Sequence, residues 1–213
     1  MASRLSLYNG ALLECGERDL ADLTENREPR RLLDRVWDNG AVDYCLGQGQ
    51  WKFATRSVQL APDPGIVPDF GYQLAYEKPS DHVRTVGIYS DEYGQVPLLQ
   101  YNMEQQYLFA DVEPIFWYYV SNHASYGGDL GGWPAEFARA VEVYLASRII
   151  KKLTQSDEKE ANMIKFAAKL FRDASSSDAM EGPTKFLPPG SWAVSRVSRS
   201  VRKDRGSRGQ LTG

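Results

Sequence analysis

The sequence predicts a mixed α+β protein, in which helix pairs near the two ends of the chain form one helical bundle around an inserted β-rich lobe. Two changes of hydrophobic period carry this prediction. Apolar residues recur at three- and four-residue steps up to residue 46 and again after residue 133, as in amphipathic helices. Between residues 51 and 121 they alternate instead, as in short strands. After residue 190 the apolar period is almost lost, which predicts an extended C-terminal arm.

Two helices are predicted before residue 50. The first covers residues 4–15 with Gly16 as a natural stop, and its regularly spaced apolar residues are Leu5, Tyr8, Leu12 and Cys15. After a polar loop, Pro29 suits the first turn of a second helix. The residues at helical spacing in this second helix are Leu33, Val36, Trp37, Gly40 and Tyr44. The segment Gly47-Gln48-Gly49 is expected to end it.

The β-rich lobe is predicted from five or six short alternating segments. Residues 51–60 form the first, and we expect its aromatic residues Trp51 and Phe53 to pack in a core. The further candidate strands are residues 72–76, 83–88, 98–102, 106–110 and 115–120. Turns that contain proline, glycine, serine and aspartate separate several of these segments.

Two further helices are predicted after the lobe. Four glycines and little periodicity between residues 122 and 133 first predict a flexible loop. Pro134 opens the clearest helix of the chain, which ends near Thr154, and Ser156 is a good N-cap for the next. The apolar face of this last helix is expected to hold Ala161, Ile164, Ala168 and Phe171. The run Ser175-Ser176-Ser177 is expected to close it.

Charge separates the C-terminal arm from the rest of the chain. The basic residues of the arm are Arg196, Arg199, Arg202, Lys203, Arg205 and Arg208. Against the single acid Asp204 they give the arm a net charge of +5, and since the whole chain carries −3, residues 1–190 carry −8. The predicted domains are a helical bundle of residues 1–50 and 133–178, a β-rich lobe of residues 51–132 and a basic arm of residues 179–213.

The sequence carries no pattern typical of an enzyme or a cofactor site. It has no phosphate-binding glycine loop, no Gly-x-Ser-x-Gly segment and no His-Glu-x-x-His segment. The two histidines and two cysteines do not have the spacing of metal ligands. Cys15 and Cys45 are expected to be reduced core thiols, although the sequence leaves a disulfide between them open. Neither a membrane-spanning helix nor a secretory signal is expected.

Five segments, taken in order, resemble one protein family. They are the helix end Leu12-Leu13-Glu14-Cys15-Gly16-Glu17, a second helix that leads into Trp51-Lys52-Phe53-Ala54, a strand with an apolar end at Leu60, the segment Tyr76-Glu77-Lys78-Pro79-Ser80-Asp81-His82-Val83-Arg84-Thr85-Val86, and the helix from Pro134 to Thr154. The fourth is similar to a Pro-x-Asp-x-x-Arg-Val segment, with Thr85 as a departure. In this order and spacing the chain resembles the tail tubular protein A family, the head-to-tail adaptors of short-tailed bacteriophages. The resemblance covers most of residues 5–175 and no part of the chain beyond Pro188.

The resemblance implies a non-enzymatic structural protein of the virion tail or neck, made in the host cytoplasm. Family members form a homododecamer ring under the portal, which bridges the portal to the tail nozzle and surrounds the channel for DNA ejection. The expected partners are therefore other copies of the chain, the portal protein and the nozzle protein. Viral DNA would pass through without specific binding, and no membrane or cofactor is expected. Two alternatives stay open: another phage neck or tail-completion connector, and a nucleic-acid-binding module that uses the basic arm.

Two sets of residues are candidates for subunit or portal contacts. The first is the aromatic run Phe116, Trp117, Tyr118 and Tyr119, because aromatic residues dominate interface energetics. In a strand, alternate members face opposite sides, so one pair can fill the lobe while the other meets a neighbour, or both can be buried. The second set is the basic residues of the arm. These have three interpretations: docking on an acidic neighbouring subunit or the portal, contact with DNA phosphates, or no partner.

Overall fold

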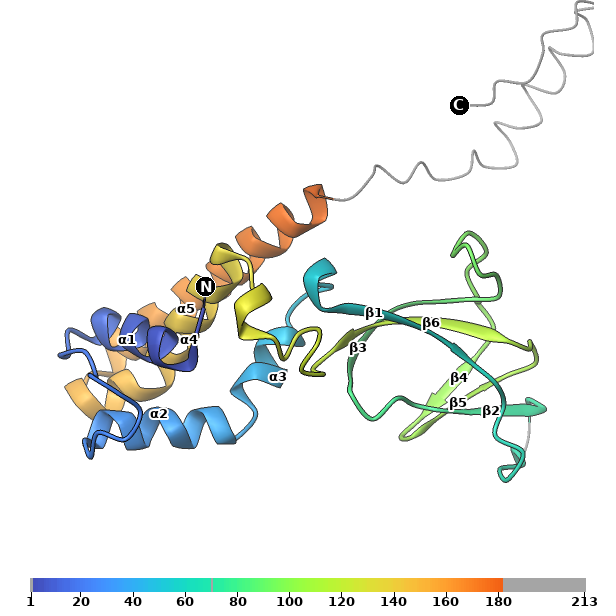
Figure 1. Ribbon diagram of the computed structural model, residues 1–213, viewed down its shortest axis with the longest axis horizontal. Coiled ribbons are helices and arrows are strands. Elements are labelled where there is room, and N and C mark those ends of the chain that lie inside the picture. The colour runs from blue at the N-terminus through green and yellow to red at the C-terminus, as the bar shows by residue number, and fades with distance from the viewer. Residues whose placement is uncertain (1, 70, 182–213) are drawn as a thin grey trace, which may run out of the picture. The chain divides into compact units, whose positions relative to one another are not determined.

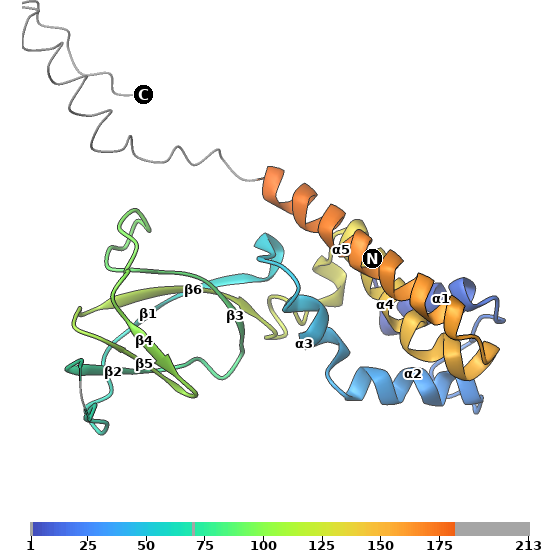
Figure 2. The same ribbon diagram turned by 180° about the vertical axis from the view of Figure 1, so that it is seen from behind.

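The computed structural model describes residues 2–69 and 71–181 (Figures 1 and 2). Its helices are α1 (Arg4–Cys15), α2 (Glu28–Asp38), α3 (Ala41–Leu46), α4 (Ala135–Thr154) and α5 (Asp157–Met180), with short 3-10 helices η1 (Lys52–Ala54) and η2 (Leu130–Gly132). Its strands are β1 (Thr55–Leu60), β2 (Leu74–Glu77), β3 (His82–Tyr89), β4 (Asn102–Glu104), β5 (Tyr107–Ala110) and β6 (Ile115–Ser121). The predicted mixed α+β class is confirmed.

Helix α1 begins and ends where the sequence predicts, because both of its ends are capped locally. The Ser3 hydroxyl oxygen accepts a hydrogen bond from the Ser6 amide, and the Ser6 hydroxyl oxygen accepts one from the Ser3 amide. At the other end Gly16 takes a φ of 76°, and its amide donates to the Leu12 and Leu13 carbonyls. The predicted N-cap of the last helix is confirmed, since the Ser156 hydroxyl accepts from the Lys159 amide at the start of α5.

The second predicted helix is wrong as a single element. Gly40 takes a φ of +81°, a left-handed conformation that glycine adopts without steric cost and that interrupts the helical hydrogen bonds. Helix α2 therefore ends at Asp38, and α3 starts at Ala41. The first strand also begins later than predicted, at Thr55, because Lys52–Ala54 form the 3-10 turn η1.

All five helices contribute to one hydrophobic core. Helices α1 and α5 both lie along α4 (Figures 1 and 2), and α4 is buried over most of its circumference. Trp51 is 1 % exposed, its ring centroid lies 4.7 Å from that of Phe137, and its Nε1 donates to the Leu46 carbonyl at 2.9 Å. Phe53 packs against the same core, so the predicted packing of these two aromatic residues is confirmed. Val120 of β6 also belongs to this core and joins it to the β-rich part.

The described strands form two three-stranded antiparallel sheets, in the orders β1-β6-β3 and β2-β5-β4. Residues of both sheets enclose a second core. Its buried members are Tyr76, Ile88, Leu98, Leu108, Ala110, Ile115, Trp117 and Tyr119. The strand predicted at residues 98–102 is wrong: the Leu98 amide donates to the Ile88 carbonyl and anchors a loop, and β4 occupies residues 102–104.

Helix α5 differs from the prediction in its buried face and in its end. Of the four residues expected on its apolar face only Phe171 is buried, while Ala161, Ile164 and Ala168 are exposed. The helix also continues past the three serines to Met180. The buried Asp178 explains this extension, because its carboxylate accepts from the Lys52 amide at 3.0 and 3.1 Å and fixes the last turn against η1.

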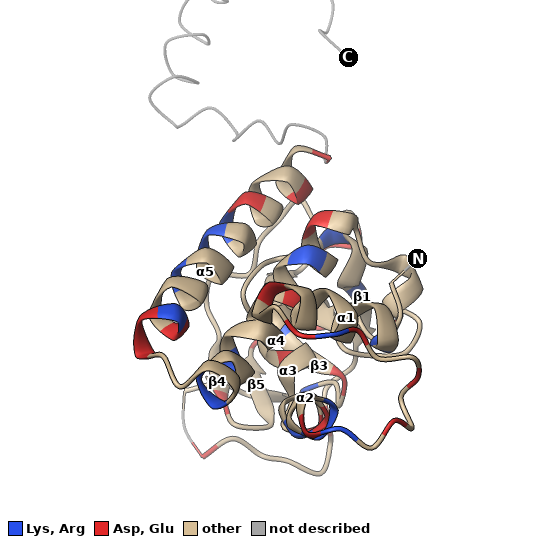
Figure 3. Ribbon diagram, turned by 90° about the vertical axis from the view of Figure 1, so that its left-hand side faces the viewer, with Lys and Arg blue, Asp and Glu red and all other residues tan. Residues whose placement is uncertain are grey.

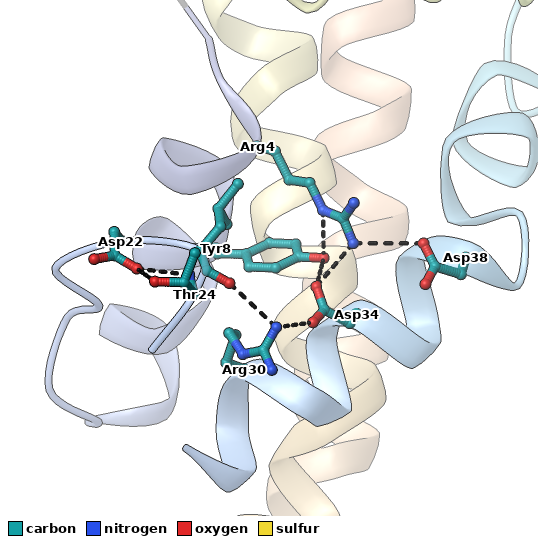
Figure 4. Close-up of polar contacts among 8 residues, drawn as sticks. Arg4, Tyr8, Asp22, Thr24, Arg30, Asp34 and Asp38 are labelled. Atoms are coloured by element: carbon teal, nitrogen blue, oxygen red, sulfur yellow. Dashed lines mark hydrogen bonds and ion pairs between the residues drawn. The ribbon is translucent and has the colours of Figure 1, made fainter. Parts of the chain in front are cut away.

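A polar network joins α1 to α2 (Figure 4). Asp34 is at its centre and accepts from Arg4 Nη2 at 2.8 Å, from the Tyr8 hydroxyl at 3.0 Å and from Arg30 Nη1 at 2.6 Å. The Arg4 guanidinium also lies over the rings of Tyr8 and Trp37. Burial raises the pKa of Tyr8 above its usual value, so the phenol keeps the proton that it donates.

Replacement of Asp34 by alanine is expected to lower the free energy of unfolding by about 2 kcal/mol, because three donors lose a charged acceptor. Chemical denaturation of the variant would measure this loss. The matched control is Asp38→Ala on the same helix, since Asp38 is 69 % exposed and meets Arg4 at only 3.4 Å. We expect the control to change stability by less than about 0.5 kcal/mol. Equal losses in the two variants would contradict the role given to Asp34.

Candidate interaction surfaces

Residues 79–86, which contain the Pro-x-Asp-x-x-Arg motif with Thr85 before Val86, form a junction between the sheets and the helices. The Asp81 carboxylate accepts from Ser121 Oγ at 2.5 Å, Tyr119 Oη at 2.9 Å and Arg56 Nη1 at 2.9 Å. Burial tends to raise the pKa of Asp81, but the hydrogen bonds from Ser121, Arg56 and Tyr119 outweigh it and lower this pKa to about 2. The Arg84 guanidinium donates to the carbonyl of Gly47, the residue that follows α3. In this structure the motif therefore makes internal contacts.

The other polar residues of this segment are also engaged internally. His82 stacks on Tyr119, and its Nε2 lies 2.9 Å from the Thr85 hydroxyl, which also accepts from Trp117 Nε1 at 3.2 Å. Burial lowers the pKa of His82 to about 4, so the imidazole is neutral at pH 7. The Thr85 hydroxyl thus lies between the ring nitrogens of His82 and Trp117.

The glycine-rich segment of residues 122–133, expected to be a flexible loop, is anchored at the buried Gly127 and Trp133, while most of its other residues are exposed. Gly127 is buried, its amide donates to the Ser121 carbonyl, and its carbonyl accepts from Trp133 Nε1 at 2.8 Å. A Cβ at Gly127 would lie 2.4 Å from the Ser121 carbonyl oxygen and 2.9 Å from Leu46 Cδ1. Glycine is therefore required here by close packing, at the point where β6 meets α3.

The aromatic run divides along β6 as the alternation predicts. Trp117 and Tyr119 are fully buried in the second core, while Phe116 and Tyr118 on the opposite face are partly exposed. This corrects the expectation that all four residues are candidates for an interface, because buried side chains cannot reach a neighbouring molecule. Only Phe116 and Tyr118 keep that role as a prediction.

Exposed large apolar residues gather instead on two of the three loops at one end of the sheets, residues 61–73 and 90–101. The register pairs Leu60 with Ile115, Leu74 with Ala110 and Tyr89 with Phe116. These residues are strand ends, so the loops that join β1 to β2, β3 to β4 and β5 to β6 lie at the same end of the sheets. We name them the distal loops: residues 61–73, 90–101 and 111–114, with residue 70 not described. Their exposed large apolar residues are Val67 (83 %), Tyr93 (75 %), Val96 (55 %), Leu99 (83 %) and Tyr101 (38 %). Beside them a groove of about 440 Å³ is lined by Ile66, Val67, Pro68, Asp69, Gly71, Tyr72, Tyr101, Asn102, Glu104 and Phe109.

A second exposed surface lies on α5. Ala161, Ile164 and Ala168 follow one another at helical spacing, and Ile164 is 48 % exposed. We name these three residues the α5 stripe. On its other side α5 leaves a groove of about 340 Å³ against α1 and α4, lined by Glu14, Cys15, Ile150, Lys159, Asn162, Met163 and Phe166. Helix α5 thus has a wider apolar surface than its neighbours cover.

The described residues hold two free cysteines, Cys15 and Cys45, as expected. Burial raises the pKa of the Cys15 thiol to about 11 and raises that of Cys45 further, which disfavours the reactive thiolates at pH 7. Within residues 2–69 and 71–181, no three His, Cys, Asp or Glu side chains are grouped to hold a metal ion. No described helix is long and apolar enough to cross a bilayer.

Sequence reasoning missed the distal loops and the exposure of the α5 stripe. The apolar run Val96-Pro97-Leu98-Leu99 within a turn-rich segment is the signal that could have indicated an exposed loop. The predicted contact residues Arg196, Arg199, Arg202, Lys203, Arg205 and Arg208 lie outside the described residues. In comparisons with family models and with curated proteins, nothing matched the chain.

Proposed function

We propose that the chain is a structural subunit that assembles head to tail into a ring, as the adaptor between the portal and the tail nozzle of a short-tailed bacteriophage. The helices before and after the β-rich part would form one bundle, and the residues after α5 would form a basic arm. The protein would act through its surfaces, without enzymatic activity. Its place would be the tail or neck of the virion.

The observation that supports this proposal best is that the body exposes two different apolar surfaces. A ring closed by one repeated contact needs two unlike faces on each subunit, whereas a two-fold dimer uses one face twice. The distal loops expose Tyr93 and Leu99 beside the β core, and α5 exposes Ile164 beside the helical core. Large exposed apolar side chains clustered in this way are typical of surfaces that bind other proteins.

The mass of the purified full-length chain, alone and after mixing with the portal protein of the same phage, tests the proposal. We expect little assembly of the isolated chain and a stable complex with the portal, in which negative-stain images show a ring of twelve copies. Native mass spectrometry would give the number of copies directly. A chain that stays monomeric with the portal present would contradict the adaptor function.

The alternative of a nucleic-acid-binding module is favoured by one observation, the net charge of +5 on residues 191–213. It predicts salt-sensitive binding of the isolated chain to DNA, lost when these residues are deleted. The adaptor predicts instead that the deletion weakens portal attachment or ring formation and leaves DNA binding negligible. A labelled DNA duplex titrated with the full-length chain and with the truncated chain, each at two salt concentrations, separates the two functions.

A further inference from the structure

The distal loops combine their exposed apolar residues with a charge of one sign. They carry the acids Asp63, Asp69, Asp91, Glu92, Asp111 and Glu113, and no lysine or arginine stands anywhere in residues 57–77 or 85–121. Asp69 and Glu92 are exposed beside the exposed Val67 and Tyr93. This end of the molecule therefore favours a partner that offers both apolar contact and positive charge.

The α5 stripe has the complementary character. Lys165, Lys169 and Arg172 follow the edge of the stripe at helical spacing, and all three are exposed. None of them forms an ion pair with another described residue. Figure 3 shows basic residues in the middle of α5 and acidic residues at both of its ends. The stripe is thus an apolar surface with bases beside it that form no ion pair with the described residues.

We propose that the distal loops of one copy of this chain bind the α5 stripe of the next copy. The occupant of each surface is a second copy, because the charges are complementary: the distal loops offer acids beside exposed aliphatic and aromatic side chains, and the α5 stripe offers bases beside exposed aliphatic side chains. The contact joins two different faces, so its repetition gives a ring or a filament and not a two-fold dimer. This inference rests on the proposed adaptor function and names its repeated contact.

The length of the stripe indicates that a single contact is weak. The stripe together with its flanking bases, from Ala161 to Arg172, spans about 18 Å of helix at 1.5 Å per residue. With a width of about 10 Å, the diameter of a helix, it offers on the order of 200 Å², well below the roughly 800 Å² that each partner contributes to a stable complex. Isolated copies should therefore associate only at high concentration and low salt, and the ring should become stable when the portal holds neighbours together.

Two charge-reversed full-length variants test the contact by sedimentation velocity at low and high salt. The first is Lys165→Glu with Lys169→Glu, and the second is Asp69→Lys with Glu92→Lys. We expect each to lower the association constant about tenfold or more, since each places like charges together. An equimolar mixture should recover association, because each reversed surface then meets an opposite charge on the other variant. The same variants are scored for ring formation on the portal.

The matched control is Arg31→Glu with Arg35→Glu, which reverses two exposed bases four residues apart on α2, outside the proposed contact. It should associate as the wild type does. Reversed variants that behave like the control, or a mixture that fails to recover, would overturn the contact. A third outcome would also overturn the contact. If deletion of residues 191–213 abolishes association while the reversal on α5 leaves it intact, the acidic loops bind the basic arm and not the α5 stripe.

The outcomes separate this contact from the function on which it rests. If rings form on the portal and neither reversal affects them, the adaptor stands and the contact is wrong. If the wild-type chain stays monomeric both alone and with the portal, the adaptor function fails and the contact fails with it. Recovery of association by the mixture supports the contact by itself, whatever the portal experiment shows.

Discussion

Replacement of Gly127 by alanine is expected to lower the free energy of unfolding by about 3 kcal/mol or more, because the new methyl group has no room. It would lie 2.4 Å from the Ser121 carbonyl oxygen and 3.0 Å from Ala54 Cβ, and neither of these atoms can rotate away. The strain would fall where β6, η1 and α3 meet, and would separate the two cores. Urea denaturation followed by tryptophan fluorescence measures the loss.

The control for this substitution is Gly131→Ala in the same segment. The nearest atom to the new Cβ at position 131 would be Asp129 Oδ1 at 3.3 Å, which belongs to a side chain that can move. We expect a change within about 0.5 kcal/mol. If both alanine variants unfold at the same denaturant concentration, residues 122–133 are not packed as described.

Replacement of Asp81 by alanine is expected to cost about 3 kcal/mol, because Arg56, Tyr119 and Ser121 all lose their shared acceptor. The Asp81 side chain is only 12 % exposed, so water cannot replace all three bonds. The control is Asp69→Ala, at an exposed position on a distal loop, with an expected change near zero. Thermal or chemical denaturation at neutral pH compares the two.

The same carboxylate gives a pH dependence with a definite sign. The pKa of Asp81 is lowered to about 2 in the folded protein from an ordinary value of 3.8, so folding favours the charged form. Its contribution to stability is fully present above about pH 4 and is lost as the pH falls toward 2. Between these values the wild type should lose more stability than Asp81→Asn. If the free energy of unfolding falls by the same amount in both proteins between pH 4 and pH 2, this expectation is contradicted.

The elements that the sequence predicted well are those with local signals at their ends. Ser3 and Gly16 bound α1 and Ser156 caps α5, and each acts on backbone groups within four residues along the chain. The alternation along β6 likewise predicted that Trp117 and Tyr119 share one face. It could not tell which face is buried, because that depends on the second sheet, whose residues come from distant positions.

The features that sequence reasoning missed depend on tertiary neighbours. Gly40 ends a helix and Gly127 fills a tight contact, yet a glycine in a sequence looks the same in both cases. Helix α5 has apolar residues around more of its circumference than its neighbours cover, so the pattern alone did not show that Ile164 is left outside. Asp178 extends the helix through a bond to Lys52, which lies 126 residues earlier.

Among the described residues of the distal loops, Leu98 is the one large side chain buried in the cores, although these loops form a substantial part of the β-rich region. Changes of sequence or length in them should therefore cost the fold little. The strands and the junction around Asp81 and Gly127 have no such freedom. During evolution the protein could thus change what it recognises by varying the loops while the scaffold that presents them stays fixed.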